Sequence, residues 1–167
     1  MTEGLHYTFR AYSLNFNGKS QPSQTASFYA CIAPSGFQKP AIVEQTQSYI
    51  TISWQPPTDD GGCRILSYAV FRDDGASGPI NTEVNANLDP LVRNLPSLNS
   101  LKVTNFPTGS QGSTFRFQIK VITTQSEALS GISFVILAGL PLQPTDVPVS
   151  DPLVTNDKQI KVSFASP

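Results

Sequence analysis

The sequence predicts an all-β protein, folded as an antiparallel β-sandwich. Short segments in which apolar and polar residues alternate recur along the 167 residues, and clusters of Gly, Pro, Asn and Asp separate them. Helical periodicity is hard to find over the same length. A third observation is self-similarity at a fixed spacing, which indicates tandem repeats.

The alternating segments define the expected strands. Tyr7–Ser13 and Thr25–Ala30 should form one hairpin, because the Asn15–Lys19 segment between them is rich in turn residues. Tyr49–Trp54 and Ile65–Phe71 are expected to form a second strand pair. The remaining expected strands are Leu101–Phe106, Phe115–Val121, Gly131–Leu137 and Gln159–Phe164.

Two comparisons within the sequence give the period of the repeat. Phe115–Val121 repeats the alternation of Tyr7–Ser13 with a shift of 108 (115 − 7). Gln159–Phe164 repeats Tyr49–Trp54 with a shift of 110 (164 − 54), which a small difference in loop length explains. A unit of this size is typical of a seven-stranded sandwich.

These residues resemble the fibronectin type III family, and the resemblance implies an immunoglobulin-like β-sandwich in tandem repeats. In that family strand B ends in a core tryptophan followed by prolines, as in Ile52–Pro57, and strand C carries a tyrosine, here Tyr68. A Gly-x-x-Tyr corner precedes strand F, and Gly4 and Tyr7 fit it. Residues 59–75 are also similar to repeats of very large surface proteins of ciliates and related protists.

The resemblance implies three parts. Residues 1–30 would be strands F and G of one repeat, residues 31–138 a complete domain, and residues 139–167 strands A and B of the next repeat. Each terminal part would then lack the strands that close its core. We therefore expect a longer array, or an assembly in which copies of the chain share strands.

The resemblance also implies a core and a departure from the family pattern. Phe115 stands where the family has the corner tyrosine, and without a hydroxyl group it cannot bond backbone, so we expect packing alone to hold this corner. The candidate core residues are Trp54, Tyr68, Phe71, Phe106, Phe117 and Ile119.

No combination of residues predicts an enzyme, a cofactor site or a metal site. His6 is the only histidine, and a general base needs a nucleophile and an orienting partner beside it. The pairs Asp59-Asp60 and Asp73-Asp74 could offer oxygen atoms to calcium, but aspartate before glycine is also an ordinary turn signal. No EF-hand spacing is present.

Cys31 and Cys63 have neither the spacing nor the histidine neighbours of a zinc site. In the fold that the resemblance implies, both lie at the same pole of the sandwich. A disulfide bridge and two free thiols both remain open at this point.

The expected partners are proteins: neighbouring repeats, or copies of the chain in a filament or homo-oligomer. A formal net charge of −1 and a pI of about 5.7 leave no basic face for nucleic acid. No apolar run approaches the roughly 18 residues of a membrane span. No Asn-x-Ser/Thr triplet occurs.

Two functions of different classes fit this sequence. The first is a non-catalytic structural and interaction segment that acts as a spacer, adhesive stalk or filament subunit. The second is an accessory module of a large enzyme or receptor whose active or ligand site lies elsewhere. We expect an extracellular or cell-surface setting, with the cilium as the alternative.

Overall fold

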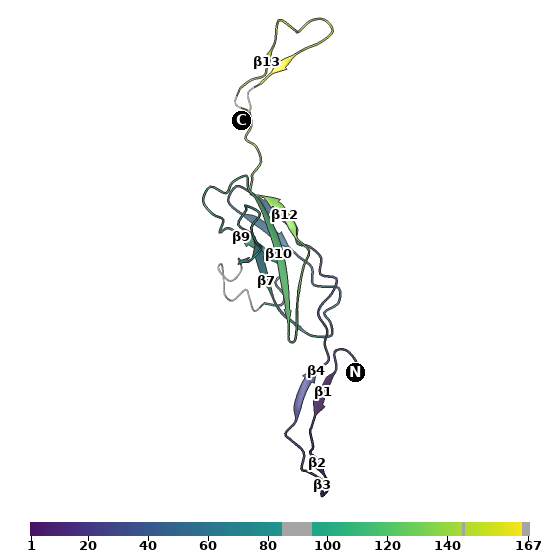
Figure 1. The fold of residues 1–167 in the computed structure, drawn as a ribbon. Helices are drawn as coiled ribbons and strands as arrows, with labels where there is room; N and C mark the ends of the chain where they lie inside the picture. The colour runs from purple at the N-terminus through teal and green to yellow at the C-terminus, as the bar shows by residue number, and fades with distance from the viewer. Residues whose placement is uncertain (85–94, 145, 165–167) are drawn as a thin grey trace.

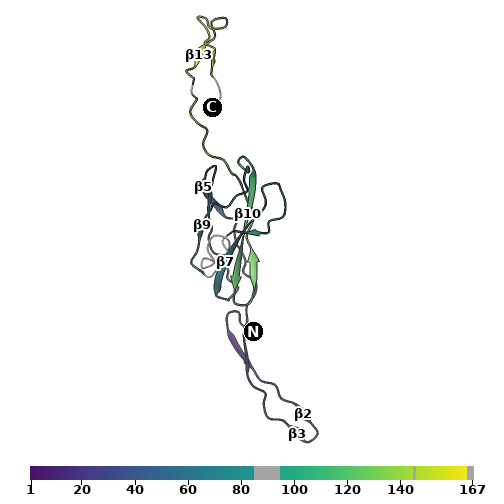
Figure 2. The same cartoon turned by 90° about the vertical axis from the view of Figure 1, so that its left-hand side faces the viewer.

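The computed structural model describes residues 1–84, 95–144 and 146–164. Within these ranges the chain forms strands and no helix, which confirms the all-β prediction. Figure 1 shows three parts in a row: an N-terminal hairpin, a two-layered sandwich, and a smaller C-terminal strand pair beyond the other end of the sandwich. The same order is seen after a quarter turn in Figure 2.

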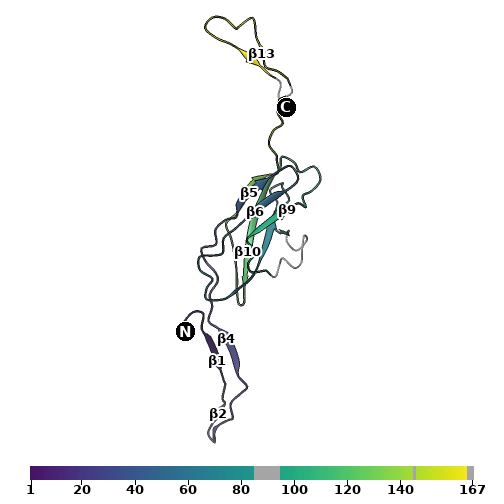
Figure 3. The same ribbon diagram turned by 180° about the vertical axis from the view of Figure 1, so that it is seen from behind.

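The sandwich consists of two antiparallel sheets. The first contains, in spatial order, β5 (Ala41–Gln45), β6 (Ile50–Ser53) and β9 (Ser100–Val103). The second contains β7 (Ile65–Arg72), β8 (Thr82–Glu83), β10 (Thr114–Thr123), β11 (Glu127–Leu129) and β12 (Ser133–Ile136). β10 is its central strand, because it pairs with β7 on one side and with β11 and β12 on the other. Figure 3 shows the first sheet in front of β10.

The terminal parts form small sheets of their own. In the N-terminal hairpin, β1 (His6–Phe9) pairs with β4 (Ala26–Tyr29), and β2 (Leu14–Asn15) pairs with β3 (Gly18–Lys19) near the tip. In the C-terminal part, β13 (Val149–Ser150) pairs with β14 (Val162–Ser163).

The core lies between the two sheets of the sandwich. Alternate residues of β10, from Phe115 to Thr123, are buried, as a strand with one inward face requires. The ring of Trp54 meets the ring of Tyr68 edge-on, with centroids 5.7 Å apart. The largest fully buried apolar side chains among the described residues are Tyr68, Phe115, Phe117, Ile50, Ile52, Ile119, Leu137, Val70, Val103 and Val121.

The expected core is largely but not wholly correct. The members that are buried as expected are Trp54, Tyr68, Phe117 and Ile119. Phe106 is only partly buried at the edge of the core. The prediction for Phe71 is wrong: Val70 is buried on the inner face, so the alternation of β7 turns Phe71 to the outer face, opposite Gln118.

Two expectations about strands also need correction. Tyr49–Trp54 and Ile65–Phe71 do not pair with each other, because β6 belongs to one sheet and β7 to the other. The segment with Pro56 and Pro57 carries the chain between the sheets. The alternation did not place the short strands β2, β3, β5, β8, β11 and β13, and strands of two or three residues cannot show an alternation.

The corner before β10 is held by packing and by a charged group. The rings of Phe106 and Phe115 meet edge-on with centroids 4.8 Å apart. The guanidinium of Arg72 lies 5.5 Å from the Phe115 centroid and donates hydrogen bonds to the carbonyl oxygens of Asn105, at 2.8 Å, and Asp73, at 2.7 Å. The expectation of packing alone was therefore incomplete. Burial lowers the pKa of the Arg72 guanidinium, and the two neighbouring aspartates oppose this shift.

Replacing Arg72 by lysine tests this corner. A lysine cannot reach both carbonyl oxygens, so one charge-assisted hydrogen bond is lost and the free energy of unfolding should fall by about 1.5–3 kcal/mol. Urea unfolding measures the change. The control is Arg64→Lys at an exposed position, which should cost less than about 0.5 kcal/mol. Equal unfolding midpoints for the two variants would contradict the role of Arg72.

Candidate functional site

His6 begins β1, at the edge of the N-terminal hairpin. Its ring lies against the ring of Tyr29, with centroids 4.8 Å apart. The imidazole has no hydrogen bond or ion pair with any described residue, so nothing there could orient it as a general base. The contact with Tyr29 is a packing contact between paired strands.

The carboxylates of both aspartate pairs are used in turns. Asp59 and Asp60 each accept the backbone N–H two residues further on, at 2.9 Å. Asp74 accepts two backbone N–H groups of its own turn, and these hydrogen bonds lower the pKa of its carboxyl. Asp73 accepts the Arg116 side chain at 2.7 Å and the Arg116 backbone N–H at 3.0 Å. In the described ranges, no three potential metal ligands of these types come together.

Cys31 and Cys63 meet at the pole of the sandwich that faces the N-terminal hairpin. Their Cα atoms lie 5.5 Å apart and the structure joins their sulfur atoms as a disulfide. The distance is within the range of about 4.4–6.8 Å that disulfide bonds require. The hydroxyl of Thr124 donates to the Cys63 sulfur at 3.0 Å. The Cys31–Cys63 bridge stays a prediction, which thiol labelling of the native protein tests.

The N-terminal hairpin has the same register as the last two strands of the sandwich. Tyr7 lies opposite Phe28, and Phe115 lies opposite Val135, so the two strands are shifted by 108 (115 − 7) and 107 (135 − 28). All four cross-strand pairs of β1 and β4 have such a counterpart in β10 and β12. The Tyr7 hydroxyl accepts the backbone N–H of Thr2 at 2.6 Å, which is the corner that the family resemblance implies.

The two hairpins differ in what covers them. Phe117 is fully buried and Val135 is 5% exposed, whereas their counterparts Phe9 and Phe28 are 47% and 56% exposed. The face of the N-terminal hairpin that corresponds to the inner face of the sandwich is therefore exposed.

The C-terminal strand pair repeats the start of the sandwich in the same way. Val149 lies opposite Ser163, as Ala41 lies opposite Ser53, and the shifts are 108 (149 − 41) and 110 (163 − 53). The second pair in this ladder, Ser150 with Val162, matches with the same shifts. The C-terminal pair thus has the register of the first two strands of a sandwich.

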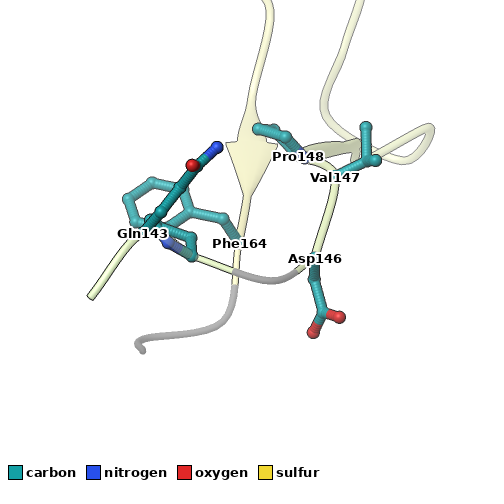
Figure 4. A pocket seen from close by; sticks show the side chains of 6 residues that line it. Gln143, Asp146, Val147, Pro148 and Phe164 are labelled. Carbon is teal, nitrogen blue, oxygen red and sulfur yellow. The ribbon is translucent and has the colours of Figure 1, made fainter.

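The inner face of the C-terminal part is open as well. Phe164, in the repeat position of buried Trp54, is 67% exposed and borders a hollow of about 510 Å³. Figure 4 shows its ring beside Gln143 and the Asp146 carboxylate turned away from it. Its other lining residues are Pro144, Val147 and Pro148, so the hollow resembles an uncovered apolar face more than a ligand site with several converging polar groups.

Sequence reasoning missed three glycines that form the contact between the hairpin and the sandwich. Gly61 and Gly62 follow the Asp59-Asp60 turn signal, and the backbone of Gly61 lies against Ile32 of the segment that enters the sandwich. Gly4, which was assigned only to the tyrosine corner, lies against Gly62. Adjacent glycines next to a cysteine were the available signal for a close backbone approach.

The described residues include no helix of the length and apolarity that a membrane crossing needs.

No protein-family model matches the chain. It is 35% identical over 74 residues to fibronectin type-III domain-containing protein 3A of Pongo abelii, which covers 43% of this chain and 6% of that protein. It is 35% identical over 101 residues to the fast-type myosin-binding protein C of Homo sapiens, with coverage of 58% and 9%. The chain thus spans less than a tenth of these relatives.

Among solved structures, the twitchin kinase region from C. elegans has a TM-score of 0.51 to this chain. The match covers 72% of this chain and 19% of that one at 15% sequence identity, so it shows the fold alone. The chain therefore has the fibronectin type III β-sandwich fold, and its similar proteins include one named for such domains.

Proposed function

We propose that this chain is a non-catalytic structural and interaction segment of a tandem array of fibronectin type III-like sandwiches. In the array, residues 1–30 and 139–167 belong to the flanking repeats and residues 31–138 form a complete one. The observation that carries the proposal is the recurrence of cross-strand registers, with a nearly constant shift along the sequence, at both ends of the sandwich.

The exposed apolar faces of the two terminal parts explain why flanking repeats, or other copies of the chain, are needed to cover them. Fully burying one large apolar side chain is worth about 1.5–3 kcal/mol, and a two-stranded hairpin alone is marginal in water. The rings of Phe9 and Phe28 reach full burial only when the missing strands of their own repeat, or strands shared by another copy, cover them. The same holds for Phe164 at the other end.

Short junctions between the sandwiches suit a spacer, a stalk or a filament subunit, because little chain is free between one domain and the next. One similar protein, myosin-binding protein C, is named for binding another protein. This supports a protein-binding structural role for the present chain, with the cell surface as its expected setting.

A matched pair of substitutions tests whether the terminal hairpin is an unfinished core. Phe117→Ala should lower the free energy of unfolding by about 3–5 kcal/mol, because it leaves a cavity in a packed core. Phe9→Ala, at the equivalent position of the N-terminal hairpin, should change the unfolding of residues 1–167 by less than about 0.5 kcal/mol. In a longer protein that contains the whole preceding repeat, Phe9→Ala should become as costly as Phe117→Ala. An equal cost in residues 1–167 would refute the proposal.

Amide exchange along residues 1–167 tests the domain boundaries. In a dilute monomer, the β10 amides should exchange slowly while the β1 and β14 amides exchange quickly, because only β10 lies in a closed sandwich. Protection of β1 and β14 should appear when flanking repeats are supplied, or at concentrations where copies of the chain associate. Strong protection of all three strands in the dilute monomer would show that the ends fold without partners.

A further inference from the structure

The pole of the sandwich that faces the N-terminal hairpin is built to hold the incoming chain. The backbone N–H of Ile32 donates to the Gly61 carbonyl at 3.0 Å, and Ser35 and Asp59 exchange two backbone hydrogen bonds, at 2.9 and 3.3 Å. From the other side, the Ser126 hydroxyl donates to the Ile32 carbonyl at 3.2 Å. Two loops of the sandwich, one with Asp59 and Gly61 and one with Ser126, thus form hydrogen bonds with residues 32–35 of the linker.

The loop leaves no room for side chains on the face that meets the hairpin. Gly61 and Gly62 have φ angles of +70° and +73°. A Cβ atom on Gly62 would lie 2.6 Å from the backbone nitrogen of Gly4, and one on Gly61 would overlap the carbonyl oxygen of Ile32. The turn at residues 3–4, which precedes β1, therefore rests directly on the backbone of the loop.

The cysteines join the same two segments covalently. Cys31 stands on the linker next to Ile32, and Cys63 follows Gly62 in the loop, with 5.5 Å between their Cα atoms. Cys63 is buried. The bridge thus reinforces a contact that hydrogen bonds and close backbone packing already define.

The linker that leaves the sandwich at its other end has neither a cysteine in the position of Cys31 nor, among the described residues, a hydrogen bond to the sandwich that it leaves. A shift of 108 places Gly139 where Cys31 stands, so no equivalent bridge is available there. Gly139 lies beside Gln47, but residues 139–144 and 146–148 form no hydrogen bond with the described part of the sandwich. Leu140 and Leu142 are exposed.

We infer that the loop of residues 59–63 is a docking surface for the end of the preceding repeat, and that the Cys31–Cys63 disulfide locks this one junction in a fixed orientation. The lock rests on the proposed tandem array. A dithiol reductant opens it: two electrons and two protons convert the bridge to two thiols while the reductant becomes a disulfide. The junction then keeps its hydrogen bonds and loses its covalent tie.

The first experiment uses residues 1–167 purified with thiols blocked by an alkylating agent. The chain should remain unlabelled without reductant, and its intact mass should be two protons lower than after reduction. The exchange rate of the Ile32 amide should rise at least about tenfold on reduction, and equally in Cys31→Ser, because opening the ring frees the linker. The control amide is that of Thr46 at the opposite pole, which donates to Tyr49 and should not change.

A second variant opens the junction without touching sulfur. Gly62→Ala places a Cβ against Gly4 and should speed exchange of the Ile32 amide. Gly109→Ala is its matched control, because Gly109 has a similar φ of +80° and nothing within 4 Å of the added Cβ. It bears the same backbone strain and should leave the Ile32 amide unchanged.

Labelling of both cysteines in the native protein would refute the proposed lock. An exchange rate of the Ile32 amide that changes neither on reduction nor in Gly62→Ala would also refute it. Neither result bears on whether residues 1–30 are part of a flanking repeat, since that is read from the exchange of β1. Protected β1 amides in the dilute monomer would overturn the array and leave the docking contact standing.

Discussion

The antiparallel pairing of β7 with β10 is the contact on which the sandwich depends. Its register sets Phe117 opposite Arg72 and Val121 opposite Tyr68, so every second residue of both strands faces the core. A slip of one residue would turn all of these side chains to the outer face. The same register delivers Arg72 to the corner beside Phe115 and places Asp73, the next residue, where Arg116 can bind it.

The sequence was informative where apolar and polar residues alternate, and where a segment recurs about 108 residues further along the chain. Alternation alone located the strand at Phe115–Val121. The repeat shift also predicted strand pairs within residues 1–30 and 139–167, and the structure pairs β1 with β4 and β13 with β14 there. The exposure of Phe9 and Phe164 is what the proposed division into incomplete repeats requires. These features are local, or they are copies of one another, so they can be read without knowing which strands are neighbours in space.

Pairing between distant strands could not be read in this way. Two adjacent alternating segments, Tyr49–Trp54 and Ile65–Phe71, looked like partners, yet their chain crosses from one sheet to the other between them. Phe71 is as apolar as its neighbours, and only the register with β10 shows that it faces outward. Arg72 carries a charge at an inward position, which no hydrophobicity pattern anticipates. The meeting of Cys31 with Cys63 likewise depends on the folded pole.

The position of the disulfide has a consequence for a string of domains under tension. If the proposed array is pulled from its ends, force enters this repeat at Cys31 and, with the proposed bridge closed, passes directly to Cys63. The residues between the two cysteines, 32 positions apart, form a covalent loop outside the load path. β5 and β6 lie within that loop, so pulling cannot peel them from the sandwich or lengthen the chain by their residues. Reduction would return both strands to the load path and make the repeat more extensible.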